Sequence, residues 1–374
     1  MSPQRQFIVQ TAIAPPISAH IVALMSRKPD IQLRRGWTTG ACATAALRAA
    51  LMALWGEGFP ERVRITLPKG ERPEFEVAYR DQGAGWAEAG IIKDAGDDPD
   101  VTHRAMIRVH VCASEGGIEF RAGEGVGTVT KPGLPIDVGE AAINPVPRQM
   151  MRDTVAEMAA RLGQSENVVI TVCVPNGRAL AEKTWNPRLG IVDGLSILGT
   201  TGIVRPFSCA AWIASIHRGI DVARASGQDH VAGCTGATSE RIVQNLHNLP
   251  DTAMLDMGDF AGGLLKYLAR HPVARLTIGG GIGKMTKLAQ GARDLHSGRT
   301  QVDFVALAET LNMAKIAEAN TALQAYDIAG EYMADYVAKG ALTQIALMLP
   351  DEVKIDVVVI DRAGAILARA GADT

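Results

Sequence analysis

The first stretch that could do chemistry is RRGWTTGACATAA, in which Thr38 and Thr39 stand directly ahead of an Ala-rich segment predicted to be a helix. The first backbone N–H groups of a helix have no partner within it, and the helix dipole adds partial positive charge there. This start could therefore bind a carboxylate of a substrate. Alternatively, the two threonines serve only as the N-cap of the helix.

A second candidate is KDAGDDPDVT, which places four aspartates beside Lys93: Asp94, Asp97, Asp98 and Asp100. Such a cluster could hold a divalent cation or accept a proton, and Asp94 is the catalytic candidate from it. Lys93 is a candidate for substrate binding. The spacing does not match an EF-hand loop, so a solvated acidic turn is the alternative.

Two glycine-rich segments could also contact a charged ligand. In GEGVGTVTKPG, alternating glycines let backbone amides approach an anion, and Lys131 follows as a substrate-binding candidate. In NPRLGIVDGLSILGTTGIVRP, Arg188 could grip a carboxylate with two hydrogen bonds, and Thr200 and Thr201 lie in a glycine-bounded turn. Hairpins and an interdomain connection are the structural alternatives.

The segment LTIGGGIGKMTKLA follows a predicted strand and opens a predicted helix, the position at which α/β sheets bind nucleotides. It departs from GxGxxG, and close packing could explain the glycines as well. Asp256 ends another predicted strand and could accept hydrogen bonds from a ribose. The candidate cofactor-binding residues are Asp256, Gly279, Gly280, Gly281, Gly283 and Lys284.

One histidine follows this turn closely. His296, in DLHSGR, is the second catalytic candidate because imidazole can exchange a proton near neutral pH. A histidine that only satisfies its own surroundings is the alternative.

The order of the strands and helices that must position these residues differs between the two halves of the chain. Short strands around one long helix predict an α+β domain over residues 31–205 with glycine-rich substrate loops. Repeated strand-then-helix segments predict an α/β Rossmann-like domain with a mostly parallel sheet over residues 206–374. In it we expect helical breaks near Gly330 and Gly340 and a closing strand VKIDVVVIDR. Residues 1–30 are predicted to be an N-terminal extension.

Composition excludes several classes of partner. The chain has 38 Lys and Arg against 40 Asp and Glu, which gives no overall field for nucleic acid or anionic lipid. Its five cysteines are odd in number and form no CxxC pair, so we expect neither disulfides nor a zinc site, and a reducing cytoplasmic location. No apolar run is long enough to cross a bilayer, and no signal peptide is predicted.

Six segments in this order resemble the CbiD family of cobalt-precorrin-5B C1-methyltransferases: RRGWTTGACATAA, KDAGDDPDVT, GEGVGTVTKPG, AINPVPR, KTWNPRLGIVDGLSILGTTGIV and GGGIGKMTKLAQGARDLHS. The first 30 residues do not match the family pattern. GGGIGK and DLHS stand where the family has G-H-x-G-K and T-H-S, although Lys284 and His296 are retained.

The resemblance implies transfer of the S-adenosylmethionine methyl group to ring carbon 1 of cobalt-precorrin-5B, giving cobalt-precorrin-6A in cobalamin biosynthesis. A ring with many carboxylate arms needs several separate anchors. Cobalt arrives inside the substrate, so no protein-bound metal is expected. The loop cations that could anchor the ring are Arg34, Arg35, Lys93, Lys131, Arg188 and Lys284.

Two other functions remain open from sequence. GEGVGTVTKPG could be the phosphate loop of a nucleotide-dependent small-molecule kinase, with the aspartates holding magnesium. The chain could also be a non-catalytic carrier of corrin intermediates. Whether it forms a homo-oligomer stays open too.

Overall fold

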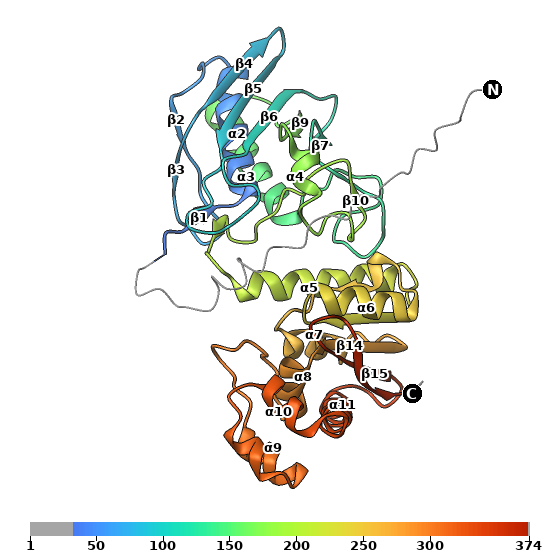
Figure 1. Cartoon of the computed structure of the whole chain (residues 1–374). Helices are drawn as coiled ribbons and strands as arrows, with labels where there is room; N and C mark the ends of the chain where they lie inside the picture. The colour runs from blue at the N-terminus through green and yellow to red at the C-terminus, as the bar shows by residue number, and fades with distance from the viewer. Residues whose placement is uncertain (1–32, 373–374) are drawn as a thin grey trace, which may run out of the picture.

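The computed structural model describes residues 33–372 and arranges them in two stacked parts (Figure 1). Each part has a large hydrophobic core of its own, whose members run from Ala41 to Ile197 and from Ile216 to Ala370. The predicted boundary near Arg205 falls between these cores, and the division into domains there stays a prediction. The predicted extension over residues 1–30 lies outside the described residues.

A five-stranded mixed sheet lies at the centre of the first part. Its order is β4-β5-β6-β9-β7, and every neighbouring pair is antiparallel except β9 and β7. Helix α2 packs on β5 and β6, and α3 packs against α2. The bounds are β4 Tyr79–Gly83, β5 Trp86–Ile92, β6 Met106–Ala113, β7 Ile118–Ala122, β9 Val168–Cys173, α2 Thr39–Leu54 and α3 Pro145–Leu162.

Helix α2 begins at Thr39 because Thr38 caps it. Thr38 is extended, and its Oγ1 accepts a hydrogen bond from the N–H of Ala41 at 3.2 Å. The helix is then buried on nearly every side up to Leu51, which explains why its sequence shows no one-sided apolar stripe. The predicted N-cap is confirmed at Thr38.

Three small antiparallel sheets complete the first part. In one of them β1 pairs with β11, so the first described strand lies beside the last strand of this part. Gly36 in β1 has no room for a side chain, because an added Cβ would lie 2.0 Å from the carbonyl carbon of Ala95. The bounds are β1 Gly36–Trp37, β11 Ile203–Val204, β2 Arg62–Arg64, β3 Glu74–Glu76, β8 Thr128–Val129 and β10 Ile191–Val192, with the short helix α4 Gly177–Ala181.

The second part is built on a sheet of order β13-β12-β14-β15-β16. The first four strands are parallel to their neighbours, and β16 runs antiparallel at the edge. The segment VKIDVVVIDR, predicted to be the closing strand, forms β15, and the sequence analysis did not predict β16 after it. The bounds are β12 His230–Cys234, β13 Met254–Leu255, β14 Arg275–Gly281, β15 Lys354–Ile360 and β16 Ile366–Gly371.

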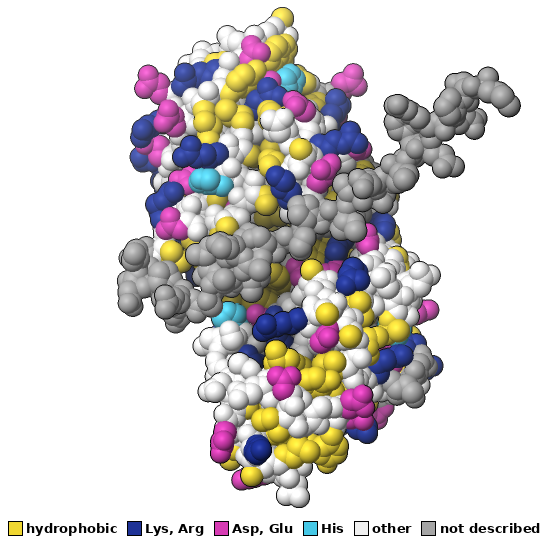
Figure 2. Space-filling view, viewed as in Figure 1, with side chains coloured by type: hydrophobic (Ala, Val, Ile, Leu, Met, Phe, Trp, Pro, Cys, Tyr) yellow, Lys and Arg dark blue, Asp and Glu magenta, His cyan; other side chains and the backbone are white. Residues whose placement is uncertain are grey.

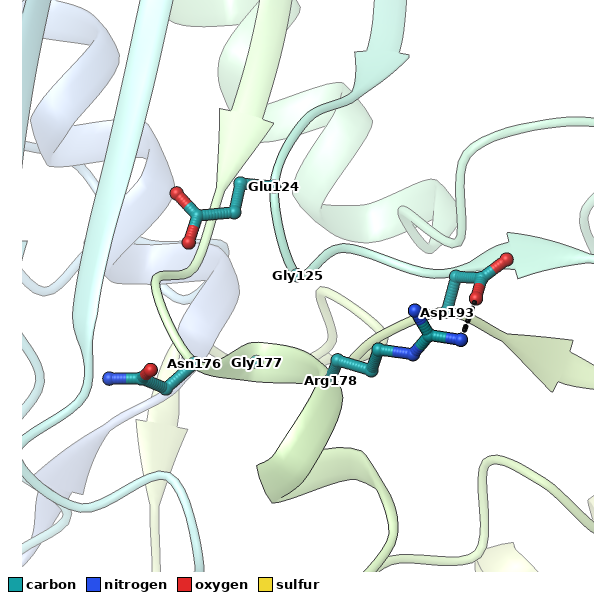
Figure 3. Close-up of a pocket in the computed structure, with 6 residues that line it drawn as sticks. All are labelled: Glu124, Gly125, Asn176, Gly177, Arg178 and Asp193. Carbon is teal, nitrogen blue, oxygen red and sulfur yellow. Dashed lines mark ion pairs between the residues drawn. The ribbon is translucent and has the colours of Figure 1, made fainter.

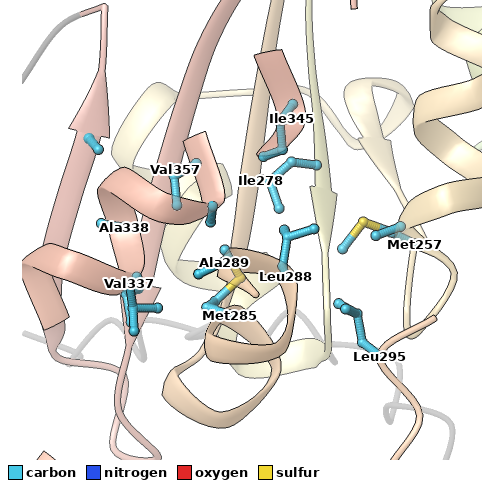
Figure 4. Close-up of a cluster of buried hydrophobic side chains, with 14 of the residues drawn as sticks. Met257, Ile278, Met285, Leu288, Ala289, Leu295, Val337, Ala338, Ile345 and Val357 are labelled. Atoms are coloured by element: carbon cyan, nitrogen blue, oxygen red, sulfur yellow. The ribbon is translucent and has the colours of Figure 1, made fainter. Parts of the chain in front are cut away.

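Helices cover this sheet and bury side chains such as Ile278, Met285 and Val337 between them (Figure 4). The predicted break at Gly340 is wrong: α11 continues through it, and Gly340 lets the helix approach Ala289. The bounds are α5 Cys209–Ala225, α6 Ala237–His247, α7 Ala261–Leu268, α8 Ile282–Ala289, α9 Phe304–Leu311, α10 Ala322–Ala329 and α11 Glu331–Ala346, with 3-10 turns η1 Asp251–Ala253 and η2 Ala314–Glu318.

The surface carries both signs of charge. On the face shown in Figure 2, basic and acidic side chains are interspersed over both parts. Within residues 33–372, none of the helices has the length and apolar character needed to cross a bilayer.

Candidate active site

The N-terminus of α2 is held against the segment 198–202. Thr39 Oγ1 accepts a hydrogen bond from the N–H of Leu198 at 2.9 Å and lies 3.2 Å from its carbonyl oxygen, to which it donates. The N–H of Thr38 donates to the carbonyl of Gly202 at 3.0 Å. Thr38 and Thr39 are buried, whereas Thr200 is exposed. The structure thus gathers four predicted substrate-binding residues: Thr38, Thr39, Thr200 and Thr201.

Asp94 lies in an ion pair with Arg34. The two side chains form two hydrogen bonds, one of them 2.9 Å between Arg34 Nη2 and Asp94 Oδ1. The hydrogen bond from the guanidinium lowers the pKa of Asp94 to about 2, with further help from the N–H of Gly96. Asp94 is therefore a fixed negative charge and a weak proton acceptor at neutral pH.

The other aspartates of this segment also have partners inside the protein. Lys93 is 1% exposed, and its Nζ lies 2.6 Å from Asp100 Oδ2. Burial opposes ionisation of Asp100, but the charge and hydrogen bond of Lys93 together with two hydrogen bonds from Thr102 outweigh it and lower the pKa. Asp98 accepts a hydrogen bond from the N–H of Phe207 at 2.8 Å, which ties this segment to the start of the second part.

The alternating glycines of GEGVG let three backbone segments meet. An added Cβ on Gly125 would lie 2.0 Å from the carbonyl oxygen of Val174, and one on Gly194 would lie 2.3 Å from that of Gly125. A surface hollow of about 360 Å³ opens here, and on its rim Arg178 pairs with Asp193 at 3.0 Å (Figure 3). The glycines are thus needed for packing, whether or not a ligand enters the hollow.

Arg188 reaches from the first part to the second. Its guanidinium forms an ion pair with Glu240 in the first turn of α6, and its Cζ lies 4.8 Å from the centre of the Trp185 ring. Lys131, another of the predicted loop cations, is partly exposed, and its stem packs on Gly190, close to Arg188 in sequence. The loop 185–190 therefore adjoins the start of α6.

The carboxyl ends of β12, β13 and β14 meet beside this ion pair. Asp256 follows β13 and is half-buried, and burial raises its pKa to about 7. The charge of Glu240 raises that pKa further, while the charges of Arg188 and Lys284 act in the opposite direction. Residues from both parts therefore share one electrostatic environment.

The glycines of the turn after β14 fall into two groups. Added Cβ atoms on Gly279 and Gly280 would lie 2.5 Å from Val243 and 2.7 Å from Thr235, so these two glycines are required for packing. Gly281 has room, since its nearest neighbour would be 4.0 Å away, and Gly283 would make an ordinary contact. Open backbone at the start of α8 is what an approaching ligand requires.

Lys284 lies in the first turn of α8, and His296 lies in the segment that follows this helix. Lys284 Nζ lies 2.9 Å from both the carbonyl oxygen of Thr235 and Asp259 Oδ1. His296 is 7% exposed, and its Nδ1 is 3.0 Å from the N–H of Gly298, which donates to it. No hydrogen bond or ion pair among the described residues joins His296 to Asp94.

The predicted cofactor residues therefore come together at one end of the second sheet, and Arg188 joins them. Sequence reasoning missed Glu240. The available signal was an acidic residue in the first turn of a helix that directly follows a strand, a favourable position next to the helix dipole.

One side-chain cluster outside this site has the ligand types of a metal site. Ligand atoms of His230, His247 and Asp356 lie within 4.8 Å of one another. However, Asp356 already accepts a 2.5 Å hydrogen bond from Arg275, whose positive charge opposes a second cation. The expectation of no protein-bound metal stays a prediction.

Two family models match this chain. One described as CbiD matches residues 26–206, and one described as the CbiD C-terminal domain matches residues 294–371. This chain belongs to the CbiD family. The match begins at residue 26, so residues 26–30 do fit the family pattern, whereas the N-terminal extension itself stays a prediction.

CbiD relatives cover nearly the whole chain. The cobalt-precorrin-5B C(1)-methyltransferase of Brucella anthropi is 57% identical over 90% of this chain and 96% of its own length. That of Brucella canis is 56% identical over the same shares. The chain is also similar to a crystal structure of a cobalamin biosynthesis protein (cbiD) from Archaeoglobus fulgidus, with 27% identity, a TM-score of 0.40, and 71% and 83% of the two chains covered.

Proposed function

We propose that this chain transfers the methyl group of S-adenosylmethionine to ring carbon 1 of cobalt-precorrin-5B, giving cobalt-precorrin-6A in cobalamin biosynthesis. The observation that carries the proposal is the 57% identity to an enzyme of that printed name over 96% of its length. Both Brucella relatives are named methyltransferases, which leaves the kinase and the carrier without support.

The second sheet is proposed to be a Rossmann-like cofactor domain that begins after Arg205. Its strand order places the carboxyl ends of β13, β12 and β14 side by side, where such sheets bind ligands. There the backbone around Gly281 and Gly283 is open, and Asp256 offers a carboxylate to ribose hydroxyls. These residues fit the needs of S-adenosylmethionine, together with Gly279, Gly280 and Lys284.

The ring is proposed to lie where the first part meets this end of the sheet. S-adenosylmethionine bound at this end of the sheet would supply an electrophilic methyl group. Its carbon–sulfur bond would break as the ring carbon forms the new carbon–carbon bond, and one proton would leave the ring. Arg188, Lys131 and Thr200 would hold carboxylate arms, while the buried threonines and Lys93 would support their loops. Alignment and exclusion of water are the main demands on the protein.

Asp94 and His296 are the two catalytic candidates, and their surroundings favour a different role for each. The ionised Asp94 would hold Arg34 toward the ring, because its pKa of about 2 makes it a poor base. His296 is proposed to act as a donor: because Nδ1 accepts the N–H of Gly298, the neutral imidazole carries its proton on Nε2, which can donate a hydrogen bond to the ring substrate but cannot take the released proton.

The direct test is to incubate the protein with cobalt-precorrin-5B and S-adenosylmethionine labelled in its methyl group. We expect mass spectrometry to show the gain of one methyl group and NMR to place it on ring carbon 1. A ring that binds without gaining a methyl would identify a carrier. Tight binding of ATP with no S-adenosylmethionine bound would identify a kinase.

The glycine turn has its own test. Gly281→Ala should weaken S-adenosylmethionine binding in calorimetry while costing no more than about 1 kcal/mol of stability, since the new Cβ meets open space. Gly280→Ala is the packing control and should cost about 1–3 kcal/mol because its Cβ overlaps Thr235 and Met285. Unchanged affinity in a folded Gly281→Ala variant would remove this turn from the site.

A cytoplasmic location, with no nucleic-acid or membrane partner, is part of the same proposal. The five cysteines are free thiols, as a reducing compartment allows. A homo-oligomer would show in light scattering.

A further inference from the structure

A second surface hollow lies between α5, α7 and the segment 293–299. Its volume is about 340 Å³, and it shares no lining residue with the hollow at Gly125. Its walls combine apolar side chains with three cationic ones, a composition that favours an apolar ligand carrying negative charge.

The apolar floor is rigid and well packed. Phe260 is 8% exposed, and its ring centre lies 6.1 Å from that of Trp212. Gly262 and Gly263 let α7 approach its neighbours closely, since added Cβ atoms would lie 2.7 Å from Arg293 and 3.0 Å from Ile213. The floor is therefore formed before any ligand arrives.

The cationic rim is only partly neutralised. Arg299 lies 5.9 Å from the centre of the Phe260 ring and forms an ion pair with Asp294. Lys266 and Arg293 are exposed, and neither has an ion pair within the described part of the chain. Two cations next to an apolar surface are thus available to an incoming anion.

Asp259 connects the walls of the hollow to the proposed cofactor end of the sheet. The N–H of Leu295 donates to the carbonyl of Asp259 at 2.9 Å, and the side chain of Asp259 pairs with Lys284. Asp259 directly precedes Phe260 in the floor. The segment 293–299 beside the hollow and Lys284 at the turn after β14 are therefore held together through Asp259.

We propose that this hollow binds a carboxylate arm of the ring substrate, with Lys266 and Arg293 as its anchors. The proposal rests on the proposed function. The methionine end of S-adenosylmethionine also bears a carboxylate, but its ammonium and sulfonium charges would face two unpaired cations here. The ring, which carries only negative arms, is the occupant that the charges favour.

Cys209 provides a direct readout of occupancy. It lines the hollow and is partly exposed, whereas Cys42 and Cys234 are buried. We expect cobalt-precorrin-5B to slow alkylation of Cys209 by iodoacetamide, mapped by mass spectrometry, and S-adenosylhomocysteine to leave it unchanged. Cys112 serves as the internal reference. Unaltered labelling at saturating ring would overturn the proposal, and protection by S-adenosylhomocysteine alone would assign the hollow to the cofactor.

Lys266→Gln and Arg293→Gln test the anchors. Each should raise KM for the ring about tenfold, the loss of one charge-assisted hydrogen bond, with kcat and S-adenosylmethionine affinity unchanged. Lys315→Gln, an exposed lysine on η2, is the matched control and should leave KM unchanged. A wild-type KM in both variants would overturn the role of Lys266 and Arg293 as anchors. If the wild-type protein transfers no methyl group at all, the proposed function is wrong. In that case the protection of Cys209 still shows whether the ring binds in the hollow.

Discussion

Asp256 and Glu240 place two carboxyl groups at one end of the second sheet. Burial and the neighbouring charge hold the pKa of Asp256 at about 7, against an ordinary value of 3.8. Near neutral pH this carboxyl is therefore divided between its two protonation states. Ribose hydroxyls donate to the ionised form, so cofactor binding and loss of this proton should be coupled.

The raised pKa predicts a specific dependence of stability on pH. Between pH 3.8 and about 7 the folded chain keeps a proton at Asp256 that the unfolded chain has released, so this group lowers the free energy of unfolding as pH rises through that window. Asp256→Asn removes the effect. The stability gained by the variant over the wild type, measured by urea denaturation, should grow from pH 4 to 7 and then stay constant.

The control for this experiment is Asp327→Asn, because Asp327 is an exposed aspartate on α10. It should give a difference from the wild type that does not change over the same pH range. A pH-independent difference for Asp256→Asn would show that the carboxyl titrates in its ordinary range.

The sequence indicated which types of residue lie in the proposed site, but it did not indicate most of the contacts that these residues make. The position of Gly281 and Lys284 at a turn between a strand and a helix could be predicted because that order is local, and their part in cofactor binding stays a prediction. Arg188 could be predicted as an anion-binding side chain, but its partner Glu240 lies 52 residues away in sequence, and the spacing carries no information about that distance. The burial of Lys93 also depends on tertiary packing and could not be predicted from its loop.

At the scale of elements, α2 depends on the segment that contacts its first turn. Thr39→Ala removes both hydrogen bonds to Leu198 and should lower the free energy of unfolding by about 1–2 kcal/mol, whereas Thr39→Ser should retain most of it. Urea denaturation measures both variants. If Thr39→Ala is as stable as the wild type but has a raised KM for the ring, the hydroxyl serves the substrate instead of the helix.

The helices and strands with a local signal were predictable. The strand–helix alternation after residue 202 predicted the parallel pairs of the second sheet because a parallel connection needs a crossover helix. β16 was missed because its alternation is broken by small residues, and Gly340 was misjudged because a helix glycine can serve close packing. The end of α9 at Leu311 was also missed, although Asn312, which adopts the left-handed conformation there, is a residue type that commonly follows the end of a helix.

At the scale of the molecule, the ion pair between Arg188 and Glu240 links the two parts. Its side chains are 33% and 18% exposed. A double-mutant cycle with Arg188→Gln and Glu240→Gln should give a coupling energy on the order of 1 kcal/mol in urea denaturation. The exposed Arg178–Asp193 pair, inside the first part, is the control and should give a smaller value. Equal couplings would argue against a special link between the parts.

The pairing of β1 with β11 has a consequence for how the protein is made. Gly36 contacts Val204 across the sheet, so the first part cannot close until the chain has been synthesised past that point. At about 5–20 residues per second, roughly ten to thirty seconds separate the two strands on the ribosome. Throughout this interval the N–H groups of Thr38 and Gly40 at the start of α2 lack their acceptors in the segment 198–202.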